Sequence, residues 1–169
     1  LHKFLFDGLP VRGMLVRLTQ SWREVLARRE PVQGGSGAYP APVRMLLGEM
    51  AAASVLMQAN IKFNGALILQ MQGDGPVRLA VAEAQPDLRF RVTAQVTGEV
   101  AEDAALEALL NVHGRGRCAI TLDPKDRLPG QQPYQGVVPL HGDRREPLQQ
   151  LAQVLEHYML QSEQLDTRL

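Results

Sequence analysis

Residues 63–98 read FNGALILQMQGDGPVRLAVAEAQPDLRFRVTAQVTG. Apolar and more polar side chains alternate in three segments, as they do along a strand with one buried face. Short turns join the segments, and Gly73-Asp74-Gly75-Pro76 forms the first of them. Such short connections allow only antiparallel pairing, so the stretch predicts a three-stranded meander. The side chains expected on its buried face are Leu67, Leu69 and Met71, then Val77, Leu79 and Val81, then Phe90, Val92, Ala94 and Val96.

Further strands and helices are predicted on both sides of this meander. Alternation predicts strands over residues 11–19, 117–122 and 134–140, and helical periodicity predicts helices over 21–29, 43–61, 102–110 and 146–164. Ser21 and Glu24 have the spacing of a capping box, and Pro147 suits the first turn of the last helix. We therefore expect an α+β domain with an antiparallel-rich sheet of about six strands, packed with helices in two layers.

Composition limits the class of protein. The 169 residues suit one compact domain, and the 18 basic and 18 acidic side chains give no net field that would attract nucleic acid. No apolar run is long enough to cross a bilayer, so we expect a cytoplasmic protein with neither nucleic acid nor a membrane as partner. Residues 31–42, rich in Gly, Ser and Pro, are predicted to form a mobile loop. The single cysteine, Cys118, is expected to be a small core residue.

The sequence contains no recognisable catalytic or metal-binding motif. The four histidines lack the short spacing of a helical metal site, and no serine occupies a strand-to-helix elbow. Gly73-Asp74-Gly75 lies between two predicted strands, whereas a phosphate-binding loop opens a helix, so a hairpin turn is favoured. We assign no catalytic, cofactor-binding or metal-binding residue, and we expect no enzyme.

Four segments carry a family resemblance: HKFLFDGLPVRG (2–13), KFNGALILQMQGDGPVRLAV (62–81), YQGVVPL (134–140) and SEQLDTRL (162–169). Together they resemble the amino-terminal domain of the 33 kDa chaperonin family, the redox-regulated heat-shock holdases. The resemblance implies a cytoplasmic homodimer that binds unfolding client proteins under stress without ATP. In that family a separate carboxyl-terminal domain carries four cysteines, which hold zinc when reduced and form disulfides when oxidised. We expect residues 1–169 to be the chaperone core, with the zinc and redox-switch domain and its linker absent from this chain.

A holdase must present apolar surface to its clients, more than the few hundred Å² usual on a monomer. The candidates come from the meander and from two apolar helices, and the sequence does not decide which face binds clients. They are Leu67, Leu69, Met71, Met57, Ile61, Phe63, Leu151, Leu155, Tyr158 and Met159. Two alternatives stay open: a small-molecule enzyme with a pocket on the sheet, and a purely structural dimerisation domain.

Overall fold

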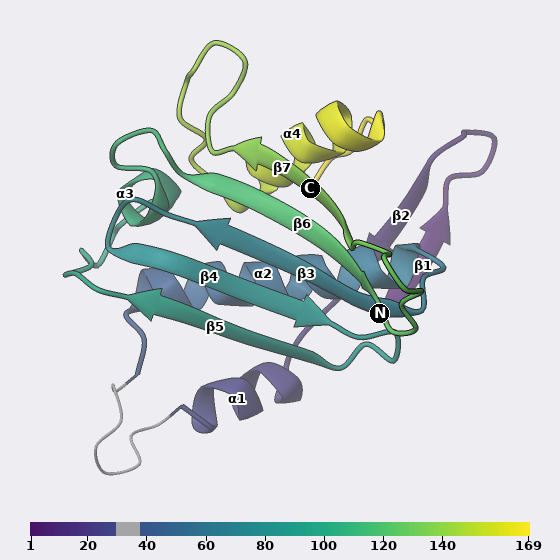
Figure 1. The fold of residues 1–169 in the computed structure, drawn as a ribbon, viewed down its shortest axis with the longest axis horizontal. Helices are drawn as coiled ribbons and strands as arrows, with labels where there is room; N and C mark the ends of the chain where they lie inside the picture. Colours follow the sequence, from purple (N-terminus) through teal and green to yellow (C-terminus); the bar gives the residue numbers. More distant parts are fainter. Residues whose placement is uncertain (30–37) are drawn as a thin grey trace.

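A computed structural model describes residues 1–29 and 38–169 of the chain (Figure 1). The loop predicted over residues 31–42 therefore falls largely outside the described residues. The elements, in chain order, are β1 (His2–Leu5), β2 (Arg12–Leu15), α1 (Gln20–Ala27), α2 (Ala41–Asn60), β3 (Gly65–Gln72), β4 (Val77–Ala84), β5 (Phe90–Val96), α3 (Leu106–Leu110), β6 (Arg117–Pro124), β7 (Tyr134–Pro139) and α4 (Leu151–Glu163).

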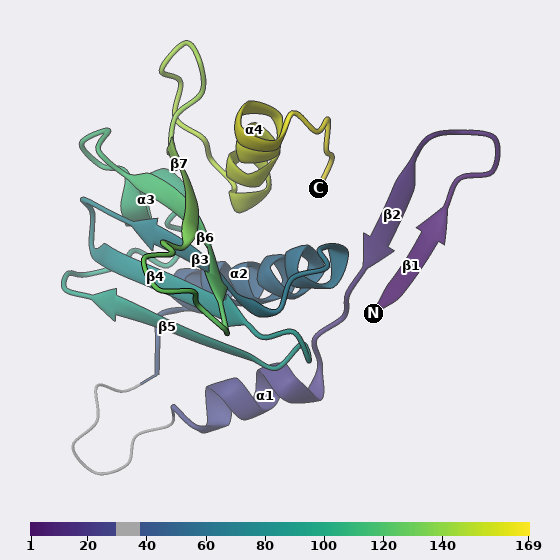
Figure 2. The same cartoon turned by 45° about the vertical axis from the view of Figure 1, so that its right-hand side comes forward.

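The predicted α+β class is confirmed, with the strands divided between two sheets. The main sheet has five antiparallel strands in the order β5-β4-β3-β6-β7, and Figure 2 shows α2 and α4 on the same side of it. β2, the strand predicted over residues 11–19, is not part of this sheet. It pairs instead with β1, a strand that the sequence analysis did not predict. The two form a hairpin that projects away from the rest of the molecule in Figures 1 and 2.

The buried face of the meander is partly as predicted. Leu67, Leu69 and Met71 of β3 are buried, and their partners on β4 are Ala84, Ala82 and Ala80. The prediction for β4 was wrong beyond Val77, because its pairing with β5 is irregular between Val77 and Leu79. That irregularity reverses the alternation. The side chains that face the core from β4 are Val77, Ala80, Ala82 and Ala84, whereas Leu79 and Val81 are half-buried on the other face.

α2 supplies the second layer of the core. Val43, Leu47 and Met50 are fully buried, and small residues such as Ala51 and Ser54 allow close approach to the sheet. Its bounds agree with the predicted helix to within two residues at the start. Cys118 of β6 is also buried in this core, which confirms its predicted place.

Three details of the predicted helices were wrong. α1 begins at Gln20 with Thr19 before it, so Ser21 lies inside the helix and caps nothing. α4 begins at Leu151, because Pro147 is held in a β-bridge with His141. Gln153 Oε1 instead accepts hydrogen bonds from the backbone N–H groups of Gln149 and Gln150, at 2.8 and 3.1 Å. α3 covers only the second half of the predicted stretch 102–110.

Candidate functional site

The β1–β2 hairpin concentrates exposed apolar side chains in one small element. Its strands pair from His2 with Leu15 to Leu5 with Arg12, and the Asp7-Gly8 turn joins them. Gly8 has φ of +72°, a conformation that glycine adopts without strain. The hairpin and its turn expose Leu1, Phe4, Leu5, Phe6, Leu9, Val11 and Leu15.

One side of this hairpin is organised around aromatic rings. The rings of Phe4 and Phe6 meet edge to face, with centroids 5.7 Å apart. Phe4 also lies across Gly13 on the facing strand, and a Cβ atom at that position would overlap its ring. Both phenylalanines nevertheless remain about half exposed. The arrangement gives a preformed aromatic surface.

The other side of the hairpin is fastened to the body of the protein. Lys3 Nζ donates a 2.7 Å hydrogen bond to the carbonyl of Ala59, near the end of α2. Met14, which pairs with Lys3 across the hairpin, lines a groove along α2. Lys3 and Met14 thus face the body, while Phe4 and its neighbours point the other way.

The groove is a large open cavity on the surface of the described residues. It has a volume of about 840 Å³ and runs between α2, α3 and the start of α4. A smaller cavity of about 320 Å³ lies between α1 and Tyr39, with Trp22 and Arg29 in its lining. The guanidinium carbon of Arg29 lies 3.6 Å from the centroid of the Tyr39 ring, a cation–π contact that closes one side of it.

The structure places most of the predicted client-binding residues in the core. Leu67, Leu69, Met71, Leu151, Leu155 and Tyr158 are buried, whereas Met57, Ile61, Phe63 and Met159 are half-buried. Only Leu151 and Leu155 border the groove. A buried side chain can contact a client only if its surroundings open, so in the folded chain these residues chiefly serve packing. Client contact through them stays a prediction.

The β1–β2 hairpin was not predicted as a functional surface, although its sequence contains a signal for it. The segment KFLFDGLPVRGML has two apolar stretches around an Asp-Gly turn, which is a strong short-range hairpin pattern. β1 was not predicted as a strand because it has only four residues and shows no alternation between buried and exposed side chains.

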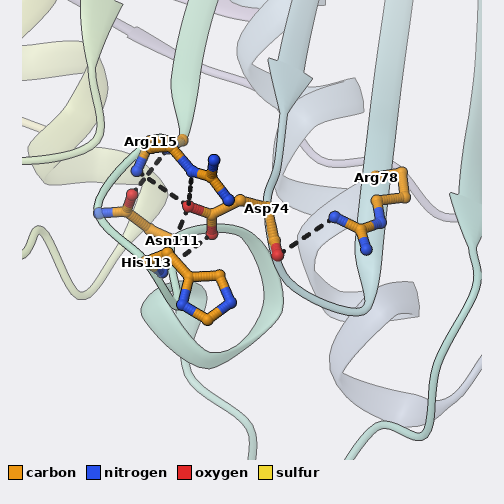
Figure 3. Close-up of polar contacts among 6 residues, drawn as sticks. Asp74, Arg78, Asn111, His113 and Arg115 are labelled. Carbon is orange, nitrogen blue, oxygen red and sulfur yellow. Dashed lines mark hydrogen bonds and ion pairs between the residues drawn. The ribbon is translucent and has the colours of Figure 1, made fainter.

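Asp74 forms the most connected polar cluster outside these apolar surfaces (Figure 3). Its carboxylate accepts backbone hydrogen bonds from His113 at 3.1 Å and from Arg115 at 2.9 Å. Burial acts to raise the pKa of Asp74, but these two bonds and the positive charge of His113 and Arg115 outweigh it, so its pKa lies below the usual value. Nearby, Asn111 Oδ1 accepts from the Gly116 N–H at 2.8 Å.

This cluster holds a turn and a loop together. The carboxylate of Asp74 binds main-chain groups of residues 113–115, and the backbone carbonyl of Asp74 accepts a bond from Arg78 at 3.2 Å. The hairpin-turn prediction for Gly73–Gly75 is confirmed, since the segment connects β3 to β4. Asp74 therefore stabilises the end of the main sheet at which β3 and β4 are joined and β6 begins.

Two kinds of feature are absent from the described residues. Residues 1–29 and 38–169 contain no group of three or more His, Cys, Asp and Glu side chains placed to hold a metal ion. Within the same residues, no helix combines the length and the apolar character that crossing a bilayer requires.

Comparison with known proteins identifies the family. The family model described as "Hsp33 protein" matches residues 1–169. The protein named 33 kDa chaperonin from Chromobacterium violaceum is 49% identical over 169 residues, which are 100% of this chain and 51% of that protein. The proteins of the same name from Aliivibrio fischeri and Neisseria gonorrhoeae are 44% and 43% identical, over 100% and 99% of this chain and 51% and 49% of theirs.

A solved structure shows the same fold. It is the 33 kDa chaperonin of Thermotoga maritima, with a TM-score of 0.61 and 19% sequence identity, and the match covers 88% of this chain and 45% of that one. The chain spans about half the length of the curated relatives that it matches. The match of the family model over all 169 residues shows that this chain belongs to the Hsp33 family.

Proposed function

We propose that residues 1–169 form the chaperone core of an ATP-independent holdase, which binds unfolding proteins and keeps them from aggregating. Relatives named 33 kDa chaperonin support this assignment over the full length of the chain. The observation that carries it is the β1–β2 hairpin, which exposes seven large apolar side chains within the first fifteen residues. The two alternatives, a small-molecule enzyme and a purely structural domain, gain no support from the relatives.

The hairpin can engage an unfolded chain in two ways. Its apolar side chains lose water when they meet the apolar side chains of a client, at about 25 cal/mol for each Å² covered. Within the described residues, β1 pairs only with β2, so each strand also presents an outer edge. The N–H and C=O groups of such an edge can accept an extended client segment as a further strand.

This activity requires no chemical step from the chain. Main-chain hydrogen bonds do not depend on client sequence, and apolar contacts require only that the client expose apolar side chains, which suits a chaperone with many clients. We therefore propose that the chain acts by binding, without nucleotide and without catalysis, as a homodimer in the cytoplasm.

Redox regulation is proposed to reside in the zinc-binding, cysteine-bearing domain of full-length family members. The only thiol in this chain, Cys118, is fully buried, and burial raises its pKa to about 12. Almost none of it is thiolate at neutral pH, so it reacts poorly with oxidants. We expect this chain to hold clients equally well with and without peroxide.

The test is suppression of light scattering by a heat-unfolded client, with no nucleotide present. The hairpin variant carries Leu5→Ser, Leu9→Ser and Leu15→Ser, all at exposed positions. We expect at least about fivefold more of this variant to be needed for half-suppression, because three of the client contacts lose their apolar surface.

The matched control carries Leu128→Ser, Leu160→Ser and Leu165→Ser, which are exposed leucines outside the hairpin. It should suppress aggregation like the wild type. Equal loss in both variants would place client binding elsewhere on the surface. A wild-type chain that suppresses no aggregation, although circular dichroism shows it folded, would reject the function itself.

A further inference from the structure

The groove beside the hairpin follows one face of α2 for most of its length. Its lining residues on this helix recur every three or four positions, from Ala41 and Pro42 through Met45, Leu46, Glu49, Ala52 and Ala53 to Leu56. Fifteen residue steps along a helix measure about 22 Å. An extended peptide rises about 3.3 Å per residue, so the groove can hold a segment of about seven residues.

The walls of the groove are mostly apolar and easily reshaped. Leu106 and Leu109 of α3 and Leu151 and Leu155 of α4 line it with little exposed surface. Met14 and Met45 border the opening, and Met45 is 67% exposed. Methionine side chains are flexible and polarizable, which lets a surface adapt to different apolar partners.

The charges in the groove are unbalanced. Three carboxylates line it, Glu49, Glu102 and Asp103, against one guanidinium, that of Arg168. Arg168 already pairs with Asp166 at 2.9 Å, whereas none of the three carboxylates forms an ion pair with another described residue. Partial burial raises the pKa of Glu49, because it removes part of the hydration of the charged form. A positively charged group on a ligand would balance the excess of carboxylates in the groove.

We propose that the groove along α2 binds an extended client segment in which apolar side chains are flanked by lysine or arginine. This inference rests on the proposed holdase function and specifies the client class. The apolar side chains lie on the α2 face, and the basic side chains reach Glu49, Glu102 and Asp103. The hairpin lies beside this groove, because Met14 of β2 lines it, while the aromatic side of the hairpin points away from it. A client that leaves the groove therefore reaches the hairpin next.

The test uses two fluorescent peptides with the same apolar centre, one flanked by lysines and one by glutamates. Binding is followed by fluorescence anisotropy with wild type, Met45→Lys and Met45→Glu. Both variants remove the same exposed side chain and differ only in charge, so loss of apolar contact affects them equally. We expect the lysine peptide to bind the Glu variant about threefold to fivefold more tightly than the Lys variant, as for a partly exposed ion pair. The difference should shrink in high salt.

A second pair of variants tests the carboxylates themselves. Glu102→Gln with Asp103→Asn should weaken the lysine peptide, whereas Glu99→Gln with Asp143→Asn makes the same charge change at exposed sites outside the groove and should not. Circular dichroism confirms that all variants are folded.

The outcomes separate the groove from the function. Equal binding of both peptides, or equal binding by Met45→Lys and Met45→Glu, would overturn the proposal while aggregation suppression by wild type leaves the holdase function intact. Peptide binding that competes with self-association in sedimentation velocity would also overturn it, because the occupant would then be a second copy of the chain. Failure of wild type both to bind either peptide and to suppress aggregation would reject the holdase function.

Discussion

The β3–β4 hairpin and the β1–β2 hairpin are built from similar residues but differ in what covers them. In β3, Leu67, Leu69 and Met71 are buried beneath helices. In the β1–β2 hairpin, Phe4 and Leu15 share a face and remain exposed. The covered β3–β4 hairpin stabilises the fold, whereas the uncovered β1–β2 hairpin leaves apolar surface available for contacts. Covering, rather than composition, therefore separates the structural β3–β4 hairpin from the hairpin that we propose binds clients.

The turns of the two hairpins also differ in how strongly they are bound to the rest of the protein. The β3–β4 turn is bound to the loop at residues 113–115 through Asp74. The β1–β2 turn is closed by its own main chain, with Phe6 N donating to Val11 O at 3.1 Å. Its acidic residue, Asp7, is fully solvent-facing. The β1–β2 turn can consequently move with little loss of contacts, which suits a surface that meets partners of different shape.

The largest effect on stability is expected from the core. Leu69→Ala removes a fully buried side chain from the central strand of the main sheet. We expect the free energy of unfolding to fall by about 3 kcal/mol, from lost transfer energy and the cavity left behind. Urea unfolding followed by circular dichroism measures it. A loss below about 1 kcal/mol would mean that the core around β3 is much less tightly packed than the structure shows.

An intermediate effect is expected from the turn of the β3–β4 hairpin. Asp74→Asn places an amide where a carboxylate accepts two N–H bonds, and we expect a loss of about 1–2 kcal/mol in the free energy of unfolding. Asp7→Asn is the matched control on the other turn and should change the free energy of unfolding by no more than about 0.5 kcal/mol. Equal losses in the free energy of unfolding from Asp74→Asn and Asp7→Asn would contradict the conclusion that the β3–β4 turn is held by its aspartate and the β1–β2 turn is not.

The pH dependence of the Asp74→Asn effect has a defined sign. Because the pKa of Asp74 is lowered on folding, its contribution is complete above the unfolded value of about 4 and is lost as pH falls through the lower folded value. The stability difference between wild type and Asp74→Asn should be constant from pH 7 to about 5 and shrink below about 4. A difference that grows at low pH would contradict the assigned role.

The core of this fold could be predicted because its signals are local. Alternation in β3 and the apolar periodicity of α2 depend on neighbouring residues, and both elements form where they were predicted. The face of β4 could not be predicted, since the irregularity between Val77 and Leu79 arises from pairing with β5. The start of α4 was predicted too early for a more local reason, because a bridge between Pro147 and His141, six residues before it in the chain, competes with the helix.

The site was harder to predict than the fold. An apolar pattern identifies residues that avoid water, but it does not say whether the same chain covers them. The candidates Leu67 and Leu155 have that pattern and lie in the core, whereas Leu5 and Leu9 have it and lie in solvent. Which helix packs on which strand is a long-range property that the family resemblance did not supply at residue level.

The smallest effect is expected from Leu5→Ala, at the most exposed apolar position of the hairpin. The side chain is 81% exposed, so its loss should change the free energy of unfolding by no more than about 0.5 kcal/mol. Urea unfolding at two protein concentrations tests this. A loss of 2 kcal/mol that grows with concentration would show that a second copy covers Leu5 in solution, because only an intermolecular contact depends on concentration. The hairpin would then resemble the buried face of β3, with its cover supplied by another chain, and a client would have to displace that copy before binding.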